Sequence, residues 1–451
     1  MGLVNTLGSF VSRTSCNDLP EVVVEATKDR LLDFLAGAFF ESKGKIVQPL
    51  FKVFKTGGRA QASTVIGRKT KLPCPQAAFI NSSMAFDTGD IPHTGCLVTA
   101  AALAMSEVEA KTGVISGKDL LLAIALGYEV AIRVGRVIGR SAFNKGLDLT
   151  GIVGPVGSAI GAGKIMALDE VKMANALSIA AGLGAGFLES SKPSRPFVLI
   201  EVGRACEAGV IAALLAREGV QGADMMLEKG MFNAFTDSPQ LGVITKDLGK
   251  DYLMPKTTMK VHGGCGSIHA PIDTAMHIVK EHNLSPGDIE QIKVQTCSGT
   301  MDDYVDAEYP ETGESARFSN PFGIASSIVF GNTFQDKFTD ANLRNKQIQE
   351  LIRRTTVERS PQLDKESPQR RAVIVEIKTK QGKVFSYRRD FAKGQAEWPM
   401  TRSEIVDKFN YMTSKALSQE RRQAITNYIY KLDAMPDLTG LFPLLGAEPK
   451  K

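Results

Sequence analysis

Histidine is scarce in this chain, and its distribution indicates two segments that could do acid–base chemistry. Of the five histidines, four lie between residues 262 and 282, and the fifth is His93. Because the imidazole pKa lies near neutrality, a histidine can serve as general acid or general base. The segment 260–269 (KVHGGCGSIH) adds Lys260 and glycines whose backbone permits close approach to a ligand. His93 ends a polar loop that begins at Asp87.

Metal binding and nucleophilic catalysis are the alternatives for these residues. The sequence has no HExxH or CxxC motif, and Asp273 is the one carboxylate a helical turn from His269, so we expect no metal site. Cys265 is a conceivable nucleophile, but no acid that would orient it lies nearby in the sequence. His277 and His282 are expected on the surface of the following helix. The sequence therefore favours acid–base chemistry without a metal or redox cofactor.

Residues 151–163 (GIVGPVGSAIGAG) combine glycine and alanine in a way that invites comparison with a phosphate-binding loop. The GxxxxGK[ST] pattern fails, because Ser158 stands where the first glycine belongs and Ile165 replaces the hydroxyl residue. We therefore expect a buried helix whose small residues let neighbouring helices approach closely.

Length and composition exclude several classes of protein. A chain of 451 residues exceeds what one hydrophobic core usually serves, so two domains are expected. Lys and Arg outnumber Asp and Glu by 54 to 49, and the excess is spread along the chain. A protein that binds nucleic acid or a membrane surface would cluster its positive charge, so neither partner is expected.

Cysteine usage and hydropathy indicate a soluble cytoplasmic protein. The six cysteines are far apart, which fits reduced thiols better than disulfides. The sequence shows no signal peptide at its start, and its longest apolar stretch, residues 120–132, is too short to span a bilayer.

Hydrophobic periodicity divides the chain into a helical part and a mixed part. Helical patterns cover residues 17–39, 118–139 and 202–218, and helix returns from about residue 401. In between, alternation predicts a strand at 289–297 and a hairpin of 373–379 with 383–388 around Gln381-Gly382, with helices at 270–282 and 319–330. The expected fold is mainly α: a large helical domain, residues 1–257 completed by 400–451, with an inserted smaller α+β domain, residues 258–399.

Five short motifs follow one another in the chain. They are MAFDT (84–88) followed by His93, TGIVGPVG (150–157), GRA (203–205) with GVIAALLAREG (209–219), Lys260 with Cys265 and His269, and RFS (317–319). In type and order they resemble the MmgE/PrpD family, which includes 2-methylcitrate dehydratase, cis-aconitate decarboxylase and iminodisuccinate epimerase. The resemblance covers essentially the whole chain.

This resemblance implies a helical domain with an α+β lid, a homodimer, and an active site between the domains. It also implies cofactor-free lyase or isomerase chemistry on a small carboxylated substrate. Position by position, it assigns catalytic roles to His93, His269, Asp148 and Lys260, and substrate binding to Asp87, Thr150 and Arg204.

The sequence departs from the family pattern at several of these places. Ala85 replaces the first acid of the family's DFDD-like run, and Asp148 stands where a second histidine is usual. Val198 and Glu201 lie about where the family has a lysine and a histidine that hold substrate carboxylates. Each lost charge-assisted hydrogen bond is worth roughly 1.5–3 kcal/mol, so binding of a tricarboxylate should be weaker.

We therefore expect a lyase of a small polycarboxylate, foremost a dehydratase of a 2-methylcitrate-like substrate. A decarboxylase or an epimerase on the same scaffold is the first alternative, because all three reactions pass through a carbanion beside a carboxylate. A non-catalytic accessory homologue is the second, and the substituted positions favour it.

Overall fold

The computed structural model describes residues 2–44, 47–55, 63–86, 93–191, 197–298, 309–367 and 370–447. Helix accounts for 61% of the structure and strand for 8%, which confirms the mainly α class. Contacts between Cα atoms divide the chain into two compact units. The first runs to Ser190 and comprises in addition Phe197–Thr257 and the chain from Thr401, whereas Thr258–Met400 forms the bulk of the second. Whether the second unit acts as a lid stays a prediction.

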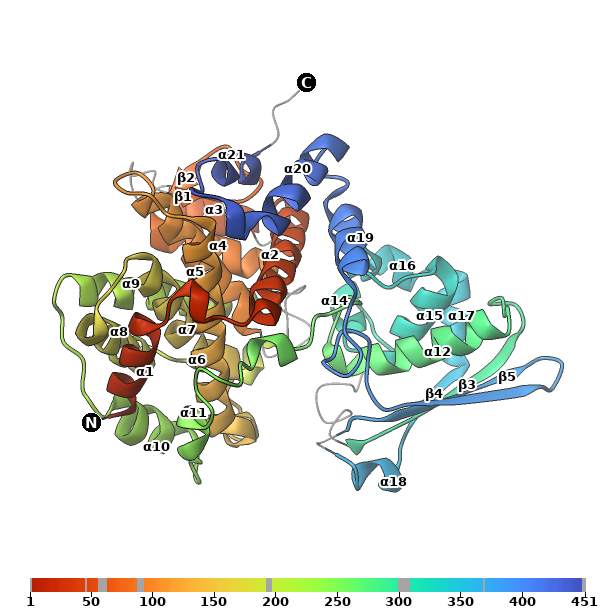
Figure 1. Cartoon of the computed structure of the whole chain (residues 1–451). Coiled ribbons are helices and arrows are strands. Elements are labelled where there is room, and N and C mark those ends of the chain that lie inside the picture. Colours follow the sequence, from red (N-terminus) through yellow and green to blue (C-terminus); the bar gives the residue numbers. More distant parts are fainter. Residues whose placement is uncertain are drawn as a thin grey trace. The chain divides into compact units, whose positions relative to one another are not determined.

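The first unit is built from helices, with a small hairpin of two short strands (Figure 1). Its elements are α1 (Leu3–Arg13), α2 (Glu21–Glu41), α3 (Val47–Lys55), β1 (Ser63–Thr64), β2 (Lys71–Leu72), α4 (Cys74–Ala85), α5 (Thr94–Glu109), α6 (Gly117–Asn144), α7 (Leu149–Ile165), α8 (Glu170–Gly182), α9 (Val198–Arg217), α10 (Asn233–Phe235), α11 (Gly242–Thr245), α19 (Arg402–Thr413), α20 (Gln419–Tyr430) and α21 (Leu441–Leu445).

Helix α7 is the glycine-rich segment, and it is buried at the centre of the first unit, against α5, α6 and α9 (Figure 1). A Cβ atom added to Gly154 would lie 2.4 Å from Leu97 Cδ2, and one added to Gly157 would lie 2.8 Å from Val98 Cγ2. Such contacts are too short for any side chain, so glycine is required for the close packing of α7 on α5. The prediction of a buried packing helix is confirmed.

Local signals explain where the helices begin. Ser116 Oγ accepts a hydrogen bond from the Asp119 backbone at 3.2 Å, and the Asp119 carboxylate accepts one from the Ser116 N–H at 2.8 Å. This capping box starts α6 near its predicted position. Helix α2 starts later than predicted, because Pro20 holds Leu19 in an extended conformation and Cys16–Asp18 form a separate 3₁₀ turn.

A buried ion pair ties the C-terminal helices to the start of the chain. Lys408 Nζ of α19 lies 2.5 Å from Asp33 Oδ1 of α2, and the two side chains are 2% and 4% exposed. Phe409, which follows Lys408 in the sequence, is completely buried. The segment from Thr401 therefore belongs to the helical unit although it follows the mixed one.

The second unit is a four-stranded sheet whose one face is covered by α12, α15 and α17 (Figure 1). Its elements are α12 (His269–Glu281), β3 (Ile289–Thr296), α14 (Gly313–Ala316), α15 (Asn320–Phe330), α16 (Asp340–Leu343), α17 (Lys346–Arg353), β4 (Thr355–Arg359), α18 (Pro361–Asp364), β5 (Val373–Thr379) and β6 (Val384–Arg389). The strand order is β4-β3-β5-β6, with β4 parallel to β3 and the other neighbours antiparallel.

Apolar residues alternate along β3 and β5 and close the core of this unit. Ile292 pairs with Ile377 and Val294 with Val375, and all four side chains are fully buried. The predicted hairpin is present as β5 and β6, with Gly382 at φ 81° in its turn. Glycine suits this turn because positive φ costs it little.

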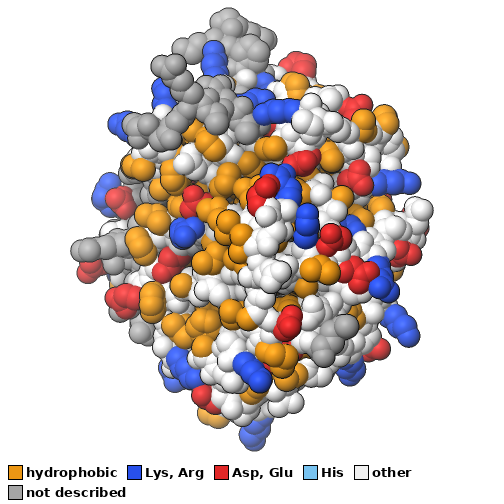
Figure 2. All heavy atoms as spheres, turned by 90° about the vertical axis from the view of Figure 1, so that its left-hand side faces the viewer, with side chains coloured by type: hydrophobic (Ala, Val, Ile, Leu, Met, Phe, Trp, Pro, Cys, Tyr) orange, Lys and Arg blue, Asp and Glu red, His pale blue; other side chains and the backbone are white. Residues whose placement is uncertain are grey.

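One face of the first unit carries several exposed apolar side chains. Figure 2 looks at the side on which α8 and α9 lie in Figure 1, and apolar side chains gather across its middle. Large apolar residues at least 39% exposed occur on these helices and in the segments beside them: Val171, Leu183, Phe187, Phe197, Leu215 and Val220. In the part of the chain that the structure describes, no helix is both long and apolar enough to cross a membrane.

Candidate active site

His93 holds an unusual backbone conformation at the start of α5. Its φ of 66° and ψ of 14° lie in the left-handed region, which non-glycine residues rarely adopt. Its ring lies 4.6 Å from the Phe86 ring, and its carbonyl accepts a hydrogen bond from Cys96 Sγ at 3.3 Å. Such strained residues cluster at functional sites, and the N–H groups at a helix start favour a bound anion.

Polar side chains from other helices lie close to the start of α5. A cavity of about 10 Å³, room for one water molecule, is lined by Gly95 and Cys96 together with Arg30, Asp33 and Tyr128. Arg30 of α2 is fixed by hydrogen bonds of 2.9 Å to the Thr257 hydroxyl and carbonyl. Sequence reasoning missed these residues because they interrupt helices that are otherwise apolar. The signal that could have found them is the presence of Arg, Asp and Tyr within helical stretches that are otherwise apolar.

Asp148 caps α7. Its Oδ1 accepts a hydrogen bond of 2.7 Å from the Thr150 N–H, and its own N–H donates to the Gly186 carbonyl at 3.1 Å. Both side chains are nearly buried, at 8% and 7% exposure. A structural role as helix cap therefore accounts for Asp148 without excluding contact with a substrate.

Glu201, the second acid at a substituted position, binds the same segment. Its carboxylate accepts hydrogen bonds from the Phe187 N–H at 3.2 Å and the Ser190 hydroxyl at 2.6 Å. Asp148 and Glu201 thus both fix the segment from Gly186 to Ser190. Backbone and hydroxyl donors offset part of the negative charge that these two acids carry.

Arg204 lies further along α9 and is the most exposed of the predicted residues that the structure describes. Its Nη1 is 3.2 Å from Glu207 Oε2, and its side chain is 57% exposed. Val198, which begins α9, is half-buried. Asp87 lies outside the described residues.

The second unit holds the other predicted residues in the segment 259–269. Lys260 is 5% exposed and His269 is 1% exposed, and the latter begins α12. The start of this segment is held close to Gly394, because the Met259 N–H donates a hydrogen bond to the Gly394 carbonyl at 2.9 Å. A Cβ atom on Gly394 would lie 2.0 Å from the Met259 oxygen, so only glycine fits there.

A histidine–aspartate pair that sequence reasoning missed lies beside His269. His262 Nε2 is 2.9 Å from Asp273 Oδ1, and the rings of His262 and His269 meet edge to face at 79°, with centroids 5.2 Å apart. Asp273 Oδ2 accepts a second hydrogen bond, from the Lys393 N–H at 2.7 Å. The carboxylate therefore orients the His262 ring, as acids orient catalytic histidines in many enzymes.

The remaining polar residues of this region have structural surroundings. Cys265 Sγ accepts a hydrogen bond from the Ser267 hydroxyl at 3.0 Å. His277 pairs with Glu281 at 3.0 Å, and the exposed His282 stacks on Phe385. Among the residues that the structure describes, no three His, Cys, Asp or Glu side chains are arranged to hold a metal ion.

The predicted residues thus form two groups. His93, Asp148, Thr150 and Arg204 belong to the first unit, whereas Lys260 and His269 belong to the second. That His93 and His269 face one cleft stays a prediction.

Comparison with known proteins identifies relatives over the full length. The cis-aconitate decarboxylase of Aspergillus terreus is 25% identical over 480 residues, covering 100% of this chain and 97% of the relative. The human cis-aconitate decarboxylase is 26% identical, covering 95% and 91%, and that of the mouse is 27% identical, covering 98% and 93%.

Two family domains match the chain. Residues 5–243 match the MmgE/PrpD N-terminal domain and residues 262–433 match the MmgE/PrpD C-terminal domain. The resemblance seen in the five motifs is therefore confirmed, and the chain belongs to the MmgE/PrpD family.

Proposed function

We propose that this protein is a lyase that acts on a small polycarboxylate by acid–base chemistry, and that its reaction is the decarboxylation of a cis-aconitate-like acid. The observation that carries the proposal is the pair of neighbouring histidines, the half-buried His262, which Asp273 orients, and the buried His269. The relatives named cis-aconitate decarboxylase match nearly the whole chain and support the reaction type.

The chemistry assigned to these residues is proton transfer beside a carboxylate. In decarboxylation, the C–C bond to a carboxylate breaks, carbon dioxide leaves, and the electron pair left behind takes a proton from an acid such as His269 or His93. Lys260 is assigned the binding of a remaining carboxylate, because a lysine ammonium offers a positive charge to it. Every step uses side chains of this chain.

Dehydration of a 2-methylcitrate-like hydroxy acid is the second candidate. Two histidines favour it, because one can remove the proton from carbon while the other protonates the leaving hydroxyl group. Asp148 and Glu201 favour an altered substrate in either case, since acids replace cationic groups that would bind a tricarboxylate.

A mass-spectrometric assay distinguishes the candidates. The purified protein is incubated with cis-aconitate, citrate and 2-methylcitrate, and the masses of the products are measured. Loss of carbon dioxide from cis-aconitate is expected, and it should be strongly reduced in His269→Gln but persist in the control His277→Asn. Loss of water alone would favour the dehydratase. If all acids stay unchanged, the protein is better explained as a non-catalytic accessory homologue.

The homodimer is also a proposal. Support comes from the apolar side chains exposed on and beside α8 and α9, because large apolar patches usually mark contact surfaces.

A further inference from the structure

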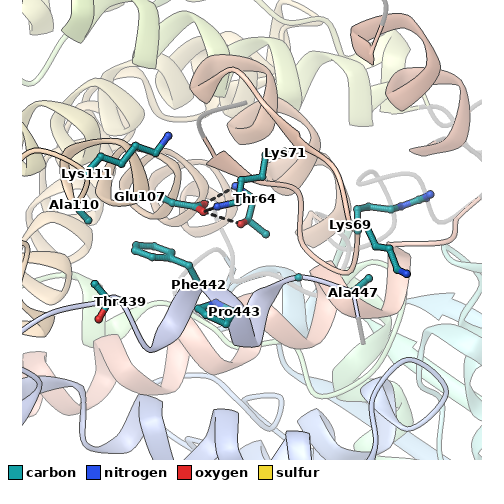
Figure 3. Close-up of a pocket in the computed structure, with 12 residues that line it drawn as sticks. Thr64, Lys69, Lys71, Glu107, Ala110, Lys111, Thr439, Phe442, Pro443 and Ala447 are labelled. Carbon is teal, nitrogen blue, oxygen red and sulfur yellow. Dashed lines mark hydrogen bonds and ion pairs between the residues drawn. The ribbon is translucent and has the colours of Figure 1, made fainter. Parts of the chain in front are cut away.

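A second pocket lies in the first unit, and none of its lining residues is a candidate catalytic residue (Figure 3). It has a volume of about 480 Å³ and lies between the β1–β2 turn, the end of α5 and the chain around α21. We call it the basic pocket, after the residues that set its character: Arg68, Lys69, Lys71, Lys111, Glu107 and Phe442.

The basic pocket has an excess of positive charge. Its described lining includes four cationic side chains but only one carboxylate, Glu107. Glu107 is already engaged, because it accepts hydrogen bonds from the Thr64 N–H at 2.5 Å and the Thr64 hydroxyl at 3.0 Å and forms an ion pair with Lys71. Among the described lining residues, Arg68, Lys69 and Lys111 add further positive charge to the pocket.

Arg68 contributes a cation that neutral groups hold in place. Its guanidinium donates to the Ser42 carbonyl and, at 3.5 Å, to Gln48 Oε1, and it lies over the Phe51 ring. Burial lowers the pKa of Arg68. The protein therefore keeps a partly desolvated positive charge at this pocket, and a bound anion would stabilise it.

The pocket is preformed by hydrogen bonds between distant segments. The Gly67 N–H donates to the Leu445 carbonyl at 2.9 Å, and the Ala447 N–H donates to the Arg68 carbonyl at 3.1 Å. Arg421 donates to the carbonyls of Pro443 and Gly446, at 2.7 and 2.9 Å. These bonds fix Phe442 as a wall of the pocket, so little ordering is needed when a ligand binds.

The positive charges are distributed along the pocket. In Figure 3, the side chains of Lys111, Lys71 and Lys69 follow one another across the view, and the Phe442 ring projects between them and the chain around Thr439. Such a distribution suits a chain of phosphates better than one compact anion, because lysines bind phosphates as separate point charges. The half-buried Phe442 ring offers a flat apolar surface.

We propose that the basic pocket binds an organic polyphosphate, with the phosphates on Lys69 and Lys111 and an apolar ring against Phe442. The volume falls within the roughly 300–1,000 Å³ of ordinary small-molecule sites. No lining residue belongs to the candidate active site, so the pocket can be occupied while the active site holds substrate.

Calorimetry at low ionic strength tests the role of the lysines, with adenosine triphosphate as the probe. Saturable binding to the full-length protein is expected. The double variant Lys69→Gln/Lys111→Gln should bind at least about tenfold more weakly, since each charge-assisted contact contributes about that factor. The matched control Lys250→Gln/Lys415→Gln removes two exposed lysines of the same unit that lie outside the pocket. Absence of binding, or equal loss in both variants, would overturn the proposal.

A second comparison tests the ring. Inorganic triphosphate should bind more weakly than adenosine triphosphate, by about fivefold or more, because a ring stacked on an aromatic side chain contributes about 1–3 kcal/mol. Phe442→Leu keeps an apolar side chain but removes the aromatic face, and it should erase this difference without lowering the melting temperature. If triphosphate and adenosine triphosphate bind equally to the native protein, the pocket is a site for inorganic anions and the organic ligand is wrong.

Discussion

At the scale of single residues, Asp273 is an acid that sequence reasoning weighed only as a possible metal ligand. It lies one turn from His269 in α12, and in the structure it pairs with His262 and with the Lys393 N–H. Asp273→Asn should lower kcat by about 10²-fold, because a misoriented reacting group costs about that much. KM and the melting temperature should change little, since asparagine can still accept the Lys393 bond. If the variant is as active as the native protein, Asp273 is not part of the active site.

His93 and His269 should both be needed for turnover. His93→Asn and His269→Gln are each expected to lower kcat by about 10²–10⁴-fold, the usual contribution of a general acid or base. Asparagine suits position 93 because it tolerates the left-handed conformation found there. His277→Asn, which changes a half-buried histidine paired with Glu281, should stay active in the same assay. Full activity of both site variants would contradict the assignment.

Asp148 should report a changed substrate preference as well as a helix cap. Asp148→His is expected to raise turnover of cis-aconitate or 2-methylcitrate and to cost about 1 kcal/mol of stability, because the cap on α7 is lost. Asp148→Asn separates the two effects, since asparagine caps a helix equally well but carries no charge. Turnover and urea denaturation measure them. If neither variant nor the native protein acts on any polycarboxylate, the result supports a non-catalytic accessory role.

At the scale of elements, local signals predicted some boundaries well and others poorly. The Ser116 cap, the Gly219 end of α9 and the β5–β6 hairpin depend on residues close in sequence, and each is present in the structure. Strand β4 was missed, because only two of its five residues are buried and its partner β3 is distant in the sequence. Helix α9 begins at Val198 rather than Val202.

In the candidate site too, features local in the sequence could be predicted, whereas contacts between distant segments could not. Histidine content and glycine content drew attention to the segment 260–269 from sequence alone. The partners of that segment could not be predicted, because Gly394 and Lys393 reach it through tertiary packing. Asp148 was identified from a family pattern, whereas its capping bond to Thr150 follows from local geometry.

The buried pair Lys408–Asp33 should be a main link between α19 and α2. Asp33→Asn leaves the Lys408 ammonium buried without its anionic partner, which should cost about 3–5 kcal/mol of unfolding free energy. The double variant Asp33→Leu/Lys408→Met replaces both charges with apolar groups and should recover much of that loss. Chemical denaturation followed by circular dichroism measures both. A small effect of the single variant would mean that α19 is held by its apolar contacts instead.

At the scale of the whole molecule, five short motifs in the right order were enough to identify the family, although none is specific alone. Order along the chain is informative because a shared fold preserves it while the residues between the motifs diverge. Reaction type does not follow in the same way, since one carbanion chemistry serves decarboxylation, dehydration and epimerisation. Assembly is a further property that the motifs do not encode.

The apolar side chains on and beside α8 and α9 should form the contact between two copies of the chain. Phe187 is 60% exposed and Leu215 is 39% exposed, and burying both against a second copy would remove apolar surface from water. We expect light scattering to give twice the mass of one chain for the native protein. Phe187→Asp/Leu215→Asp should give the mass of a single chain, because a buried unpaired carboxylate is strongly unfavourable. Val114→Asp, at a site 77% exposed and outside these helices, is the control and should stay a dimer. A native protein with the mass of one chain would show that this surface does not pair two copies.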